Sequence, residues 1–459
     1  MTDFVRWMLE QEGRALLTRL GRVKPFALQE SMLPAANLLP DAQIVIERFL
    51  MVGRRQLREM VNRFLEWLHA PEGVQADPAE AQHRFTLVRL RFNAVLTQFD
   101  LFDNVITQRS ESETGLWLSG LDVASADALK LNKPYFDTPP VICYLDRGAG
   151  AAIRRARTRI PGGGASPVAI IQVPRERMIG TGIASSLFHE VGHQASALLG
   201  LVESLRPELR AAAREAGADA PAWGLWERWI SEIVADLWSA GRVGVAATMG
   251  LMGVVSLPRP FIFRLNPDDP HPAPWIRVKL SAAIGDALYP DPFWGSLVQL
   301  WESYYPRDGL GPSQLAQFEM LERTTPRLAQ LLIQHRPATL QGNSLGEVLR
   351  LDELRPGCLR ASLQRWRLKP HEMYRARPIV AFAAIGQGRA DGTLTPEEEG
   401  VVLGKLLTHW ALISTLDAAA GSAARSGSHC ECQKHPQNKH GFETNRRTSC
   451  QTPSRSPGW

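Results

Sequence analysis

The sequence predicts an α+β protein that consists mainly of helix, with a short β-rich segment between two helical regions. In residues 1–136 and again in residues 311–420, apolar residues recur every three or four positions, which is typical of amphipathic helices. Between these regions, two short apolar runs at 141–145 and 168–173 lie close to prolines and predict strands. We therefore divide the chain into helical residues 1–136, a mixed domain at 137–310, helical residues 311–420 and a tail at 421–459.

The tail differs from the rest of the chain in composition. It contains no Leu or Val and is rich in polar residues, so it cannot bury a core and is predicted to be disordered. It includes four residues of types that bind zinc: His429, Cys430, Cys432 and His435. Their CxC spacing is not that of a zinc finger and no second cysteine pair accompanies it, so we predict no metal site there.

Composition excludes several classes of protein. The chain has 459 residues, of which 44% are apolar and 22% charged, which excludes a collagen-like or wholly disordered protein. The formal net charge is +5, and the last 35 residues alone carry +4. The folded part is therefore close to neutral, and we predict no nucleic-acid partner.

Signals for export or membrane insertion are absent from the sequence. The first 20 residues carry charges throughout and lack the apolar stretch of a signal peptide. The longest uncharged apolar run, Val243–Leu257, has 15 residues, fewer than the ~20 of a membrane span, and predicts a buried helix. Five cysteines at uneven spacing suit a reducing compartment. We predict no transmembrane segment and a cytoplasmic location; no pattern indicates an oligomeric state.

Two helices are expected in the N-terminal region, separated by a break at Pro71-Glu-Gly. The first helix is predicted by apolar residues at helical spacing: Leu57, Met60, Val61, Phe64, Leu65 and Leu68. The second is predicted in the same way by Val88, Phe92, Val95 and Phe99. No group of residues here has the character of a catalytic site, so we interpret the region as a packing or regulatory part.

A glycine triplet, Gly162–Gly164, precedes the strand predicted at 168–173. It lacks the lysine of a phosphate-binding loop and the spacing of a dinucleotide-binding loop, so we interpret it as a hairpin connection.

The segment that carries chemistry is the HExxH sequence at 189–193. His189 and His193 are four positions apart, so on a helix both imidazoles project from one face and can bind one zinc ion. Glu190 lies between them, where its carboxylate can reach a water molecule that zinc activates. The small and apolar residues around the motif predict a buried helix.

A third protein ligand is needed, because catalytic zinc sites use three protein ligands and leave one position open. A histidine six residues after His193 would indicate a metzincin, but that position is Leu199. Glu232 and Asp236 share one face of a predicted helix, so Glu232 can bind zinc while Asp236 orients a histidine ligand. Three other downstream acids, Glu203, Glu215 and Asp219, lie in the polar stretch 203–221, which we expect to be a surface connection.

A third motif follows at 269–278, where His271 precedes Pro272 and Arg277 follows six residues after the histidine. In this order HExxH, ExxxD and HPxxxxR, over about residues 165–290, the chain resembles gluzincin zinc peptidases of the CAAX prenyl protease type. The resemblance implies a zincin-like domain. The membrane-embedded members of that family have several spanning helices and this chain has none, so we carry over the chemistry and not the prenylated membrane substrate.

The resemblance also implies a role for each motif residue. His189, His193 and Glu232 would bind zinc, and Glu190 would be the general base. His271 would approach the metal and stabilise the developing oxyanion, and Arg277 would brace the same loop or contact substrate. By analogy with zinc peptidases, the strand at 168–173 would lie at a sheet edge and pair with an extended substrate.

One further segment, Asp391 to Glu398, has the look of half a calcium-binding EF-hand loop. In that register Arg389 would occupy a position that needs a ligand oxygen. We therefore interpret the segment as a helix start, with Thr395 and Glu398 forming a capping box around Pro396.

The sequence as a whole predicts a zinc-dependent metallopeptidase that acts on a protein or peptide, with Glu190 as the base. Two alternatives remain open at this point. One is a zinc hydrolase that acts on a non-peptide amide, and the other is a zinc-binding scaffold without catalytic activity.

Overall fold

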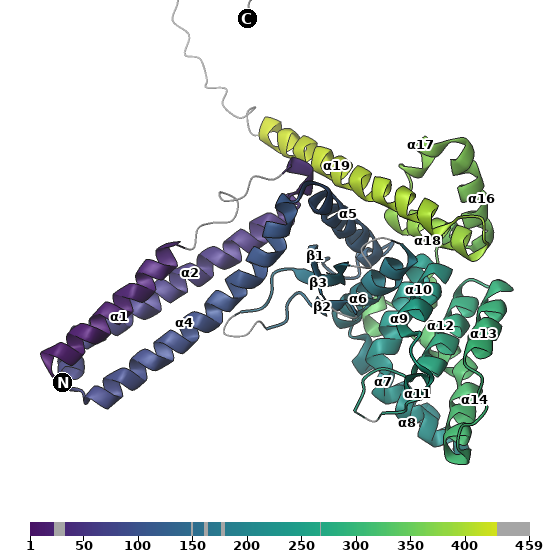
Figure 1. The fold of residues 1–459 in the computed structure, drawn as a ribbon, viewed down its shortest axis with the longest axis horizontal. Helices are drawn as coiled ribbons and strands as arrows, with labels where there is room; N and C mark the ends of the chain where they lie inside the picture. The colour runs from purple at the N-terminus through teal and green to yellow at the C-terminus, as the bar shows by residue number, and fades with distance from the viewer. Residues whose placement is uncertain (23–32, 148–149, 160–163, 176–179, 267, 429–459) are drawn as a thin grey trace, which may run out of the picture. The chain divides into compact units, whose positions relative to one another are not determined.

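The computed structural model describes residues 1–22, 33–147, 150–159, 164–175, 180–266 and 268–428. It is mainly helical, with 75% helix and 4% strand, and contains one small three-stranded sheet (Figure 1). This confirms the predicted class of a mainly helical α+β protein. Residues 1–416 form one compact unit, and the end of the last helix belongs to a second unit that starts at Asp417.

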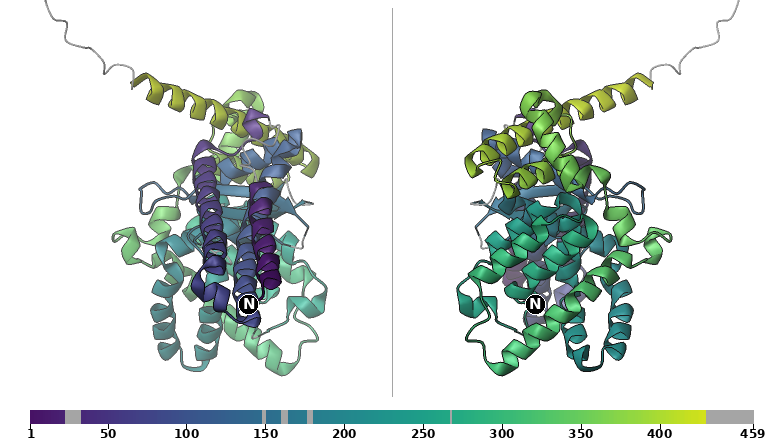
Figure 2. Two further views of the ribbon diagram at one scale, coloured as in Figure 1. Left: turned by 90° about the vertical axis from the view of Figure 1, so that its left-hand side faces the viewer. Right: turned by 90° about the vertical axis from the view of Figure 1, so that its right-hand side faces the viewer.

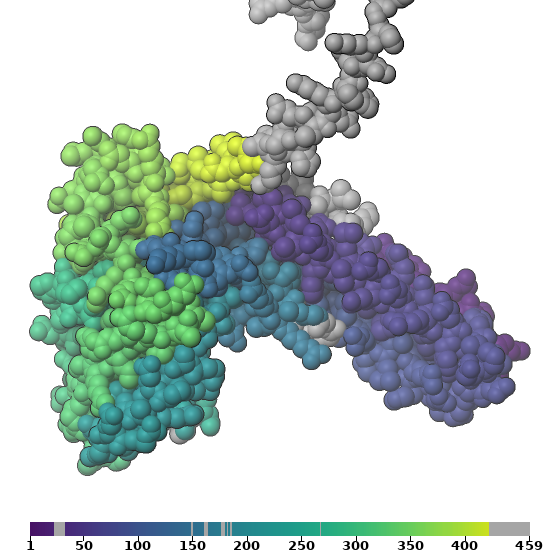
Figure 3. Space-filling model, turned by 180° about the vertical axis from the view of Figure 1, so that it is seen from behind, coloured from purple at the N-terminus to yellow at the C-terminus, as the bar shows by residue number. Residues whose placement is uncertain are grey.

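The N-terminal helices lie side by side (Figure 2, left). They are α1 (Asp3–Arg22), α2 (Pro40–His69), α3 (Pro71–Gln75) and α4 (Pro78–Thr107). Phe64 of α2 packs against Phe85 of α4 with ring centroids 5.5 Å apart, and apolar residues at helical spacing fill the space between the helices. Figure 3 shows these helices, coloured purple to blue, as one continuous part of the surface. Both predicted helices and the break at Pro71 are confirmed.

The sheet consists of β1 (Val141–Asp146), β2 (Ala152–Arg154) and β3 (Ala169–Pro174), in the order β1-β3-β2. Strands β1 and β3 are parallel, whereas β2 runs antiparallel to β3. The two predicted strands are confirmed, but the expectation that 168–173 lies at a sheet edge is wrong. The reason is that the chain between β1 and β3 turns back and adds β2 on the outer side of β3.

Both faces of the sheet are covered. Ile142 and Ile170 point to one face and pack in the same apolar cluster as the N-terminal helices. Cys143, Ile171 and Val173 point to the other face and belong to the larger cluster that includes the HExxH helix. Successive strand residues point to opposite faces, so β1 and β3 each contribute to both clusters.

Side chains close the outer edge of β1. Gln108 donates to the carbonyl oxygen of Leu145 and accepts from its amide, each at 2.7 Å. Asp122 accepts from the amide of Cys143 at 2.7 Å, and Arg109 donates to the Cys143 carbonyl at 2.9 Å. These contacts satisfy the backbone groups that a neighbouring strand would otherwise pair with.

The remaining described residues form helices and short 3-10 turns. The helices of the region that contains the three sequence motifs are α5 (Ser112–Leu129), α6 (Thr181–Leu199), α7 (Leu201–Glu215), α8 (Ala220–Arg228), α9 (Ile230–Val243), α10 (Val245–Val255), α11 (Arg259–Ile262) and α12 (Pro274–Leu288). They are followed by α13 (Phe293–Tyr304), α14 (Pro312–Gln334), α15 (Leu345–Leu349), α16 (Pro356–Leu368), α17 (Pro370–Met373), α18 (Pro378–Ala390) and α19 (Pro396–Ser428). The 3-10 turns are η2 (Pro34–Ala36), η3 (Gln108–Ser110), η5 (Gly217–Asp219), η6 (Ala338–Leu340) and η7 (Asp352–Leu354).

Other sequence expectations have mixed outcomes. The apolar run at 243–257 forms α10, which is largely buried as predicted. The stretch 203–221 is not simply a surface connection, because most of it belongs to α7, which buries Leu201, Leu205 and Leu209 one turn apart. Helix α19 continues to Ser428, beyond the predicted start of the tail at 421. The rest of the tail, including its cysteines, and residues 162–163 of the glycine triplet lie outside the described residues.

Among the described helices, none is both long enough and apolar enough to cross a membrane.

Candidate metal centre

Helices α6 and α9 come into close contact at the HExxH motif, and a glycine makes this contact possible. A methyl group added at Gly192 would lie 2.8 Å from the Cα and carbonyl oxygen of Ala235 and 2.9 Å from Cβ of Trp238. Ordinary van der Waals contact is 3.4–4 Å. Only a residue without a side chain therefore lets the backbones of α6 and α9 come this close.

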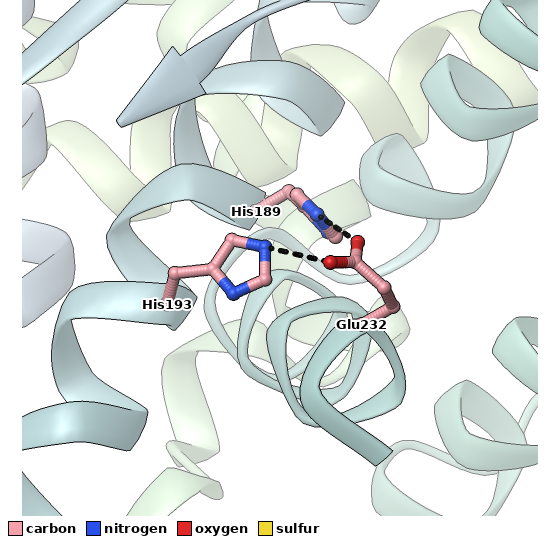
Figure 4. Close-up of side chains that lie close together, drawn as sticks. All are labelled: His189, His193 and Glu232. Carbon is pink, nitrogen blue, oxygen red and sulfur yellow. Dashed lines mark hydrogen bonds and ion pairs between the residues drawn. The ribbon is translucent and has the colours of Figure 1, made fainter. Parts of the chain in front are cut away.

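Three side chains converge from these two helices (Figure 4). His189 and His193 lie on one face of α6, with ring centroids 4.7 Å apart. Nε2 of His189 is 3.1 Å from Oε2 of Glu232, and Nε2 of His193 is 3.4 Å from Oε1. One nitrogen from each ring and one carboxylate oxygen all lie within 4.8 Å of one another, so the group could hold a metal ion.

Asp236 orients the first histidine. Its Oδ1 lies 2.8 Å from Nδ1 of His189, so Nδ1 donates to the carboxylate and Nε2 is directed at Glu232. Arg277 of α12 holds Asp236 in place through two hydrogen bonds, from Nε at 2.7 Å and from Nη2 at 2.9 Å. This paired geometry fixes the carboxylate, and through it the imidazole plane.

The charges of these groups follow from burial and pairing. Burial opposes charge on His189, but the neighbouring charge of Asp236 and hydrogen bonds to Asp236 and Glu232 prevail and raise its pKa to about 9. Burial also opposes ionisation of Glu232, yet hydrogen bonds from three histidines hold its pKa well below the usual range. For Asp236, the charge of Arg277 outweighs burial and lowers the pKa. Both carboxylates are therefore ionised at neutral pH, and Glu232 is the one that could bind a metal ion.

Glu190 is buried next to the cluster. Burial raises the pKa of its carboxyl group, while the positive charges of His189 and His193 act in the opposite direction. A carboxyl group in such a place exchanges a proton more readily near neutral pH than an exposed one does.

His271 reaches the same carboxylate from the chain segment that precedes α12. Its Nε2 lies 3.1 Å from Oε2 of Glu232, and its Nδ1 lies 2.9 Å from Oδ1 of Asp269. The Asp269 carboxylate also accepts from the backbone amide of His271 at 3.0 Å. The hydrogen bond with Glu232 is the main cause of the raised pKa of His271, which is 47% exposed. Asp269 thus holds one side of the ring while the other side faces the cluster.

The structure brings the residues of the three sequence motifs into one site. His189, His193, Glu232, Asp236, His271 and Arg277 are linked by direct polar contacts, and Glu190 lies in their electrostatic field. The three alternative acids do not join them. They form ion pairs with arginines elsewhere, Glu203 with Arg206, Glu215 with Arg327 and Asp219 with Arg323, as expected of a solvated face.

The segment at 391–398 is a helix start, as interpreted from the sequence. The Glu398 carboxylate accepts from the amide of Thr395 at 2.8 Å, and the Thr395 hydroxyl accepts from the amide of Glu398 at 3.3 Å. Asp391 binds the guanidinium of Arg360.

Sequence reasoning missed two residues of the site. Asp269 stands two positions before His271, a spacing at which Asp often bonds to the backbone that follows it. Gly192 lies inside the HExxH motif itself, where the two variable positions give no warning that one of them must be small.

No family model matches the chain, and the same holds for the curated proteins and for the solved structures. A functional conclusion therefore has to come from the residues of the site.

Proposed function

We propose that the chain is a zinc-dependent metallopeptidase whose zincin-like core consists of the sheet, α6 and α9. The observation that carries this proposal is the convergence of His189, His193 and Glu232, with the buried carboxyl group of Glu190 one residue from the first ligand.

The donor atoms fit zinc. Two imidazole nitrogens and one carboxylate oxygen make up a set that catalytic zinc sites use, and the fourth position is then left to a reacting molecule. Softer metals prefer sulfur, and magnesium or calcium prefers an all-oxygen shell. The orientation of His189 by Asp236 is the support that zinc-binding histidines usually have.

Bound zinc would supply Lewis acidity, which acidifies water and polarises a carbonyl group. The chain's own residues supply the rest of the chemistry. Glu190 takes a proton at its carboxylate and returns it to the leaving nitrogen, a role that suits a carboxyl group whose pKa burial has raised. His271 is held at Nδ1 by Asp269, and the Nε2–H group that here faces Glu232 would turn to the carbonyl oxygen and stabilise its negative charge. Arg277 acts through Asp236 and keeps the first imidazole in position.

The substrate is proposed to be an extended peptide. An open sheet edge next to the metal centre can pair with a peptide backbone and bind it with little dependence on sequence. Because β3 is the central strand, this edge is β2 and not the strand first expected.

The test has two steps. The first is zinc content of the purified protein with Cys430, Cys432 and Cys450 replaced by serine, so that tail thiols do not contribute. We expect one zinc per chain, and a Glu232→Ala variant that loses it; no zinc even after reconstitution would overturn the proposal.

The second step is hydrolysis of a peptide library by the zinc-loaded protein beside Glu190→Gln. We expect the variant to keep its zinc and to lose turnover. Zinc-loaded wild type that cleaves no peptide would leave a scaffold protein, or a hydrolase of another amide, as the better explanation.

A further inference from the structure

The second edge of the sheet carries an unusual concentration of positive charge. Five exposed arginines lie on β2 or within five residues of its ends in the sequence: Arg147, Arg154, Arg155, Arg157 and Arg159. Within the described part of the chain, no carboxylate forms an ion pair with any of them. Many exposed arginines elsewhere, such as Arg323 and Arg327, do have such partners. The charge around β2 is therefore available to an external anion.

Strand β2 also has a free backbone edge. One side of β2 pairs with β3, through Ala152 to Arg154 opposite Ile170 to Gln172. In the described chain no strand pairs with the other side of β2. The opposite edge of the sheet is not free, because side chains from η3 and α5 bind the backbone of β1. Any added strand would consequently join the sheet at β2, among the arginines.

This edge is attached directly to the proposed metal centre. The amide of Ala156 donates to Oε1 of Gln194 at 2.8 Å. Gln194 is the residue that follows His193, and both it and Ala156 are buried. A chain bound along β2 would thus lie beside the helix that carries both histidines.

The backbone of Arg157 gives an independent indication that its side chain is used. Arg157 has φ 64°, a left-handed conformation that glycine adopts with less strain than arginine. Arg157 and Thr158 lie opposite the single residue Ser166, with hydrogen bonds of 2.8 Å from Arg157 N to Ser166 O and from Ser166 N to Thr158 O. This is a β-bulge, in which glycine is the usual residue at the left-handed position. Among the described residues, the Arg157 side chain donates only to the backbone oxygen of Asp137, at 3.3 Å, which does not require an arginine.

We propose that β2 and the bulge after it, residues 152–159, bind extended acidic peptide segments and that these are the substrate class of the proposed peptidase. The statement that such peptides are substrates rests on the proposed function, whereas the statement that they bind at this edge does not. Backbone pairing along β2 would supply affinity, and guanidinium–carboxylate contacts would select peptides with Asp or Glu at alternate positions. The residues from 150 to 159 include no aromatic side chain on which bases could stack, which favours a peptide over a single-stranded nucleic acid.

The experiment measures binding separately from cleavage. Fluorescence anisotropy would follow labelled peptides of about ten residues with alternating Glu and Val, Ser and Val, or Lys and Val. The protein is the full chain with Glu190→Gln, so that no peptide is turned over during the titration. We expect the Glu peptide to bind at least about tenfold more tightly than the Ser peptide, and the Lys peptide more weakly than either.

Variants locate the binding surface. Arg154→Gln with Arg155→Gln should raise the Kd of the Glu peptide about tenfold or more. The matched control is Arg214→Gln with Arg375→Gln, which removes the same charge from two exposed arginines of α7 and of the α17–α18 connection that also have no side-chain partner in the described chain. That control should leave Kd within about twofold.

The Arg157→Gly variant tests the contribution of the Arg157 side chain separately from the strain of its backbone. Glycine relaxes the left-handed position, so the midpoint of unfolding should stay the same or rise. Affinity for the Glu peptide should nevertheless fall. Unchanged affinity in both Arg variants, or no preference for the Glu peptide, would overturn the proposal.

Two further outcomes have a definite meaning. Oligothymidine of the same net charge that binds as tightly as the Glu peptide would also overturn the proposal, because the surface would then attract any polyanion. Wild-type protein that takes up no zinc, or that is loaded with zinc and cleaves no peptide, would refute the proposed peptidase, whereas a measured preference for the Glu peptide would still leave the acidic-peptide site in place. The two proposals can therefore fail independently.

Discussion

Replacement of Gly192 by alanine tests the geometry on which the metal centre depends. The added methyl group would lie 2.8 Å from two backbone atoms of Ala235 and 2.9 Å from Cβ of Trp238. Two of these three atoms belong to backbone, which cannot rotate away. To restore an ordinary contact of 3.4–4 Å, helices α6 and α9 would have to separate by roughly 0.6–1.2 Å.

Two quantities should change together. Overpacking of this kind costs about 1–3 kcal/mol of the free energy of unfolding. The same separation moves Glu232 away from both histidines, and metal–ligand distances tolerate only about 0.2 Å of error. We therefore expect zinc affinity to fall by about 10–100-fold, as for loss of a supporting contact.

Urea unfolding would measure the first quantity, and competition with a chromophoric chelator the second. Gly224→Ala is the matched control, because Gly224 lies in helix α8 and an added methyl group there meets nothing within 4 Å. The control should be neutral or slightly more stable, with unchanged zinc affinity. If Gly192→Ala unfolds at the wild-type urea concentration and binds zinc equally well, the close contact between α6 and α9 is wrong.

Three smaller perturbations address other contacts. Asp236→Asn should weaken zinc binding about 10–100-fold in the chelator assay, because it removes the negative charge and one of the two acceptor oxygens that hold His189 and Arg277; equal affinity would contradict that role. Thr395→Ala should cost about 1 kcal/mol in urea unfolding by loss of a helix cap, with zinc binding unaffected. Asp291→Asn should destabilise the protein at pH 7 but not near pH 2, because hydrogen bonds from Arg360 lower the pKa of Asp291. The stabilisation by the Asp291 carboxylate is present above its pKa of about 4 in the unfolded chain and is lost as pH falls through its lower pKa in the folded protein. An equal effect at both pH values would argue against this ion pair.

The elements of the site that sequence predicts well are those set by local geometry. A spacing of four places His189 and His193 on one face of α6, and the same spacing places Glu232 and Asp236 on one face of α9. Whether the two faces meet is not a local property. It depends on Gly192, on the two hydrogen bonds of Arg277 and on tertiary packing, and the structure does bring them together.

The elements that sequence predicts poorly depend on contacts between distant residues. Strand β2 is only Ala-Ile-Arg, too short and too polar to indicate a strand, and it exists because β3 pairs with it. The analogy with zinc peptidases predicts the strand at 168–173 to lie at an edge, but the pairing with β2 makes β3 the central strand. Helix α7 was misjudged for a different reason. Its many charged residues suggested a surface connection, but Leu201, Leu205 and Leu209 recur every four positions and are buried.

The boundary at residue 136 that the sequence predicts between the N-terminal helices and the domain at 137–310 leads to a last prediction. Without those residues β1 would lose Gln108, Arg109 and Asp122, and with them the partners of four backbone groups of Cys143 and Leu145.

Each unsatisfied buried polar group costs about 1–3 kcal/mol, and one apolar face of the sheet, with Ile142 and Ile170, would be exposed to water as well. The sum is comparable to the 5–15 kcal/mol that typically stabilises a domain. A fragment that starts at residue 137 should therefore fail to fold cooperatively, as measured by near-ultraviolet circular dichroism and urea unfolding. A fragment of this kind that is soluble, unfolds in one sharp transition and binds one zinc ion would show that the N-terminal helices are an accessory. The contacts along β1 instead make them part of the core that positions α6 and α9.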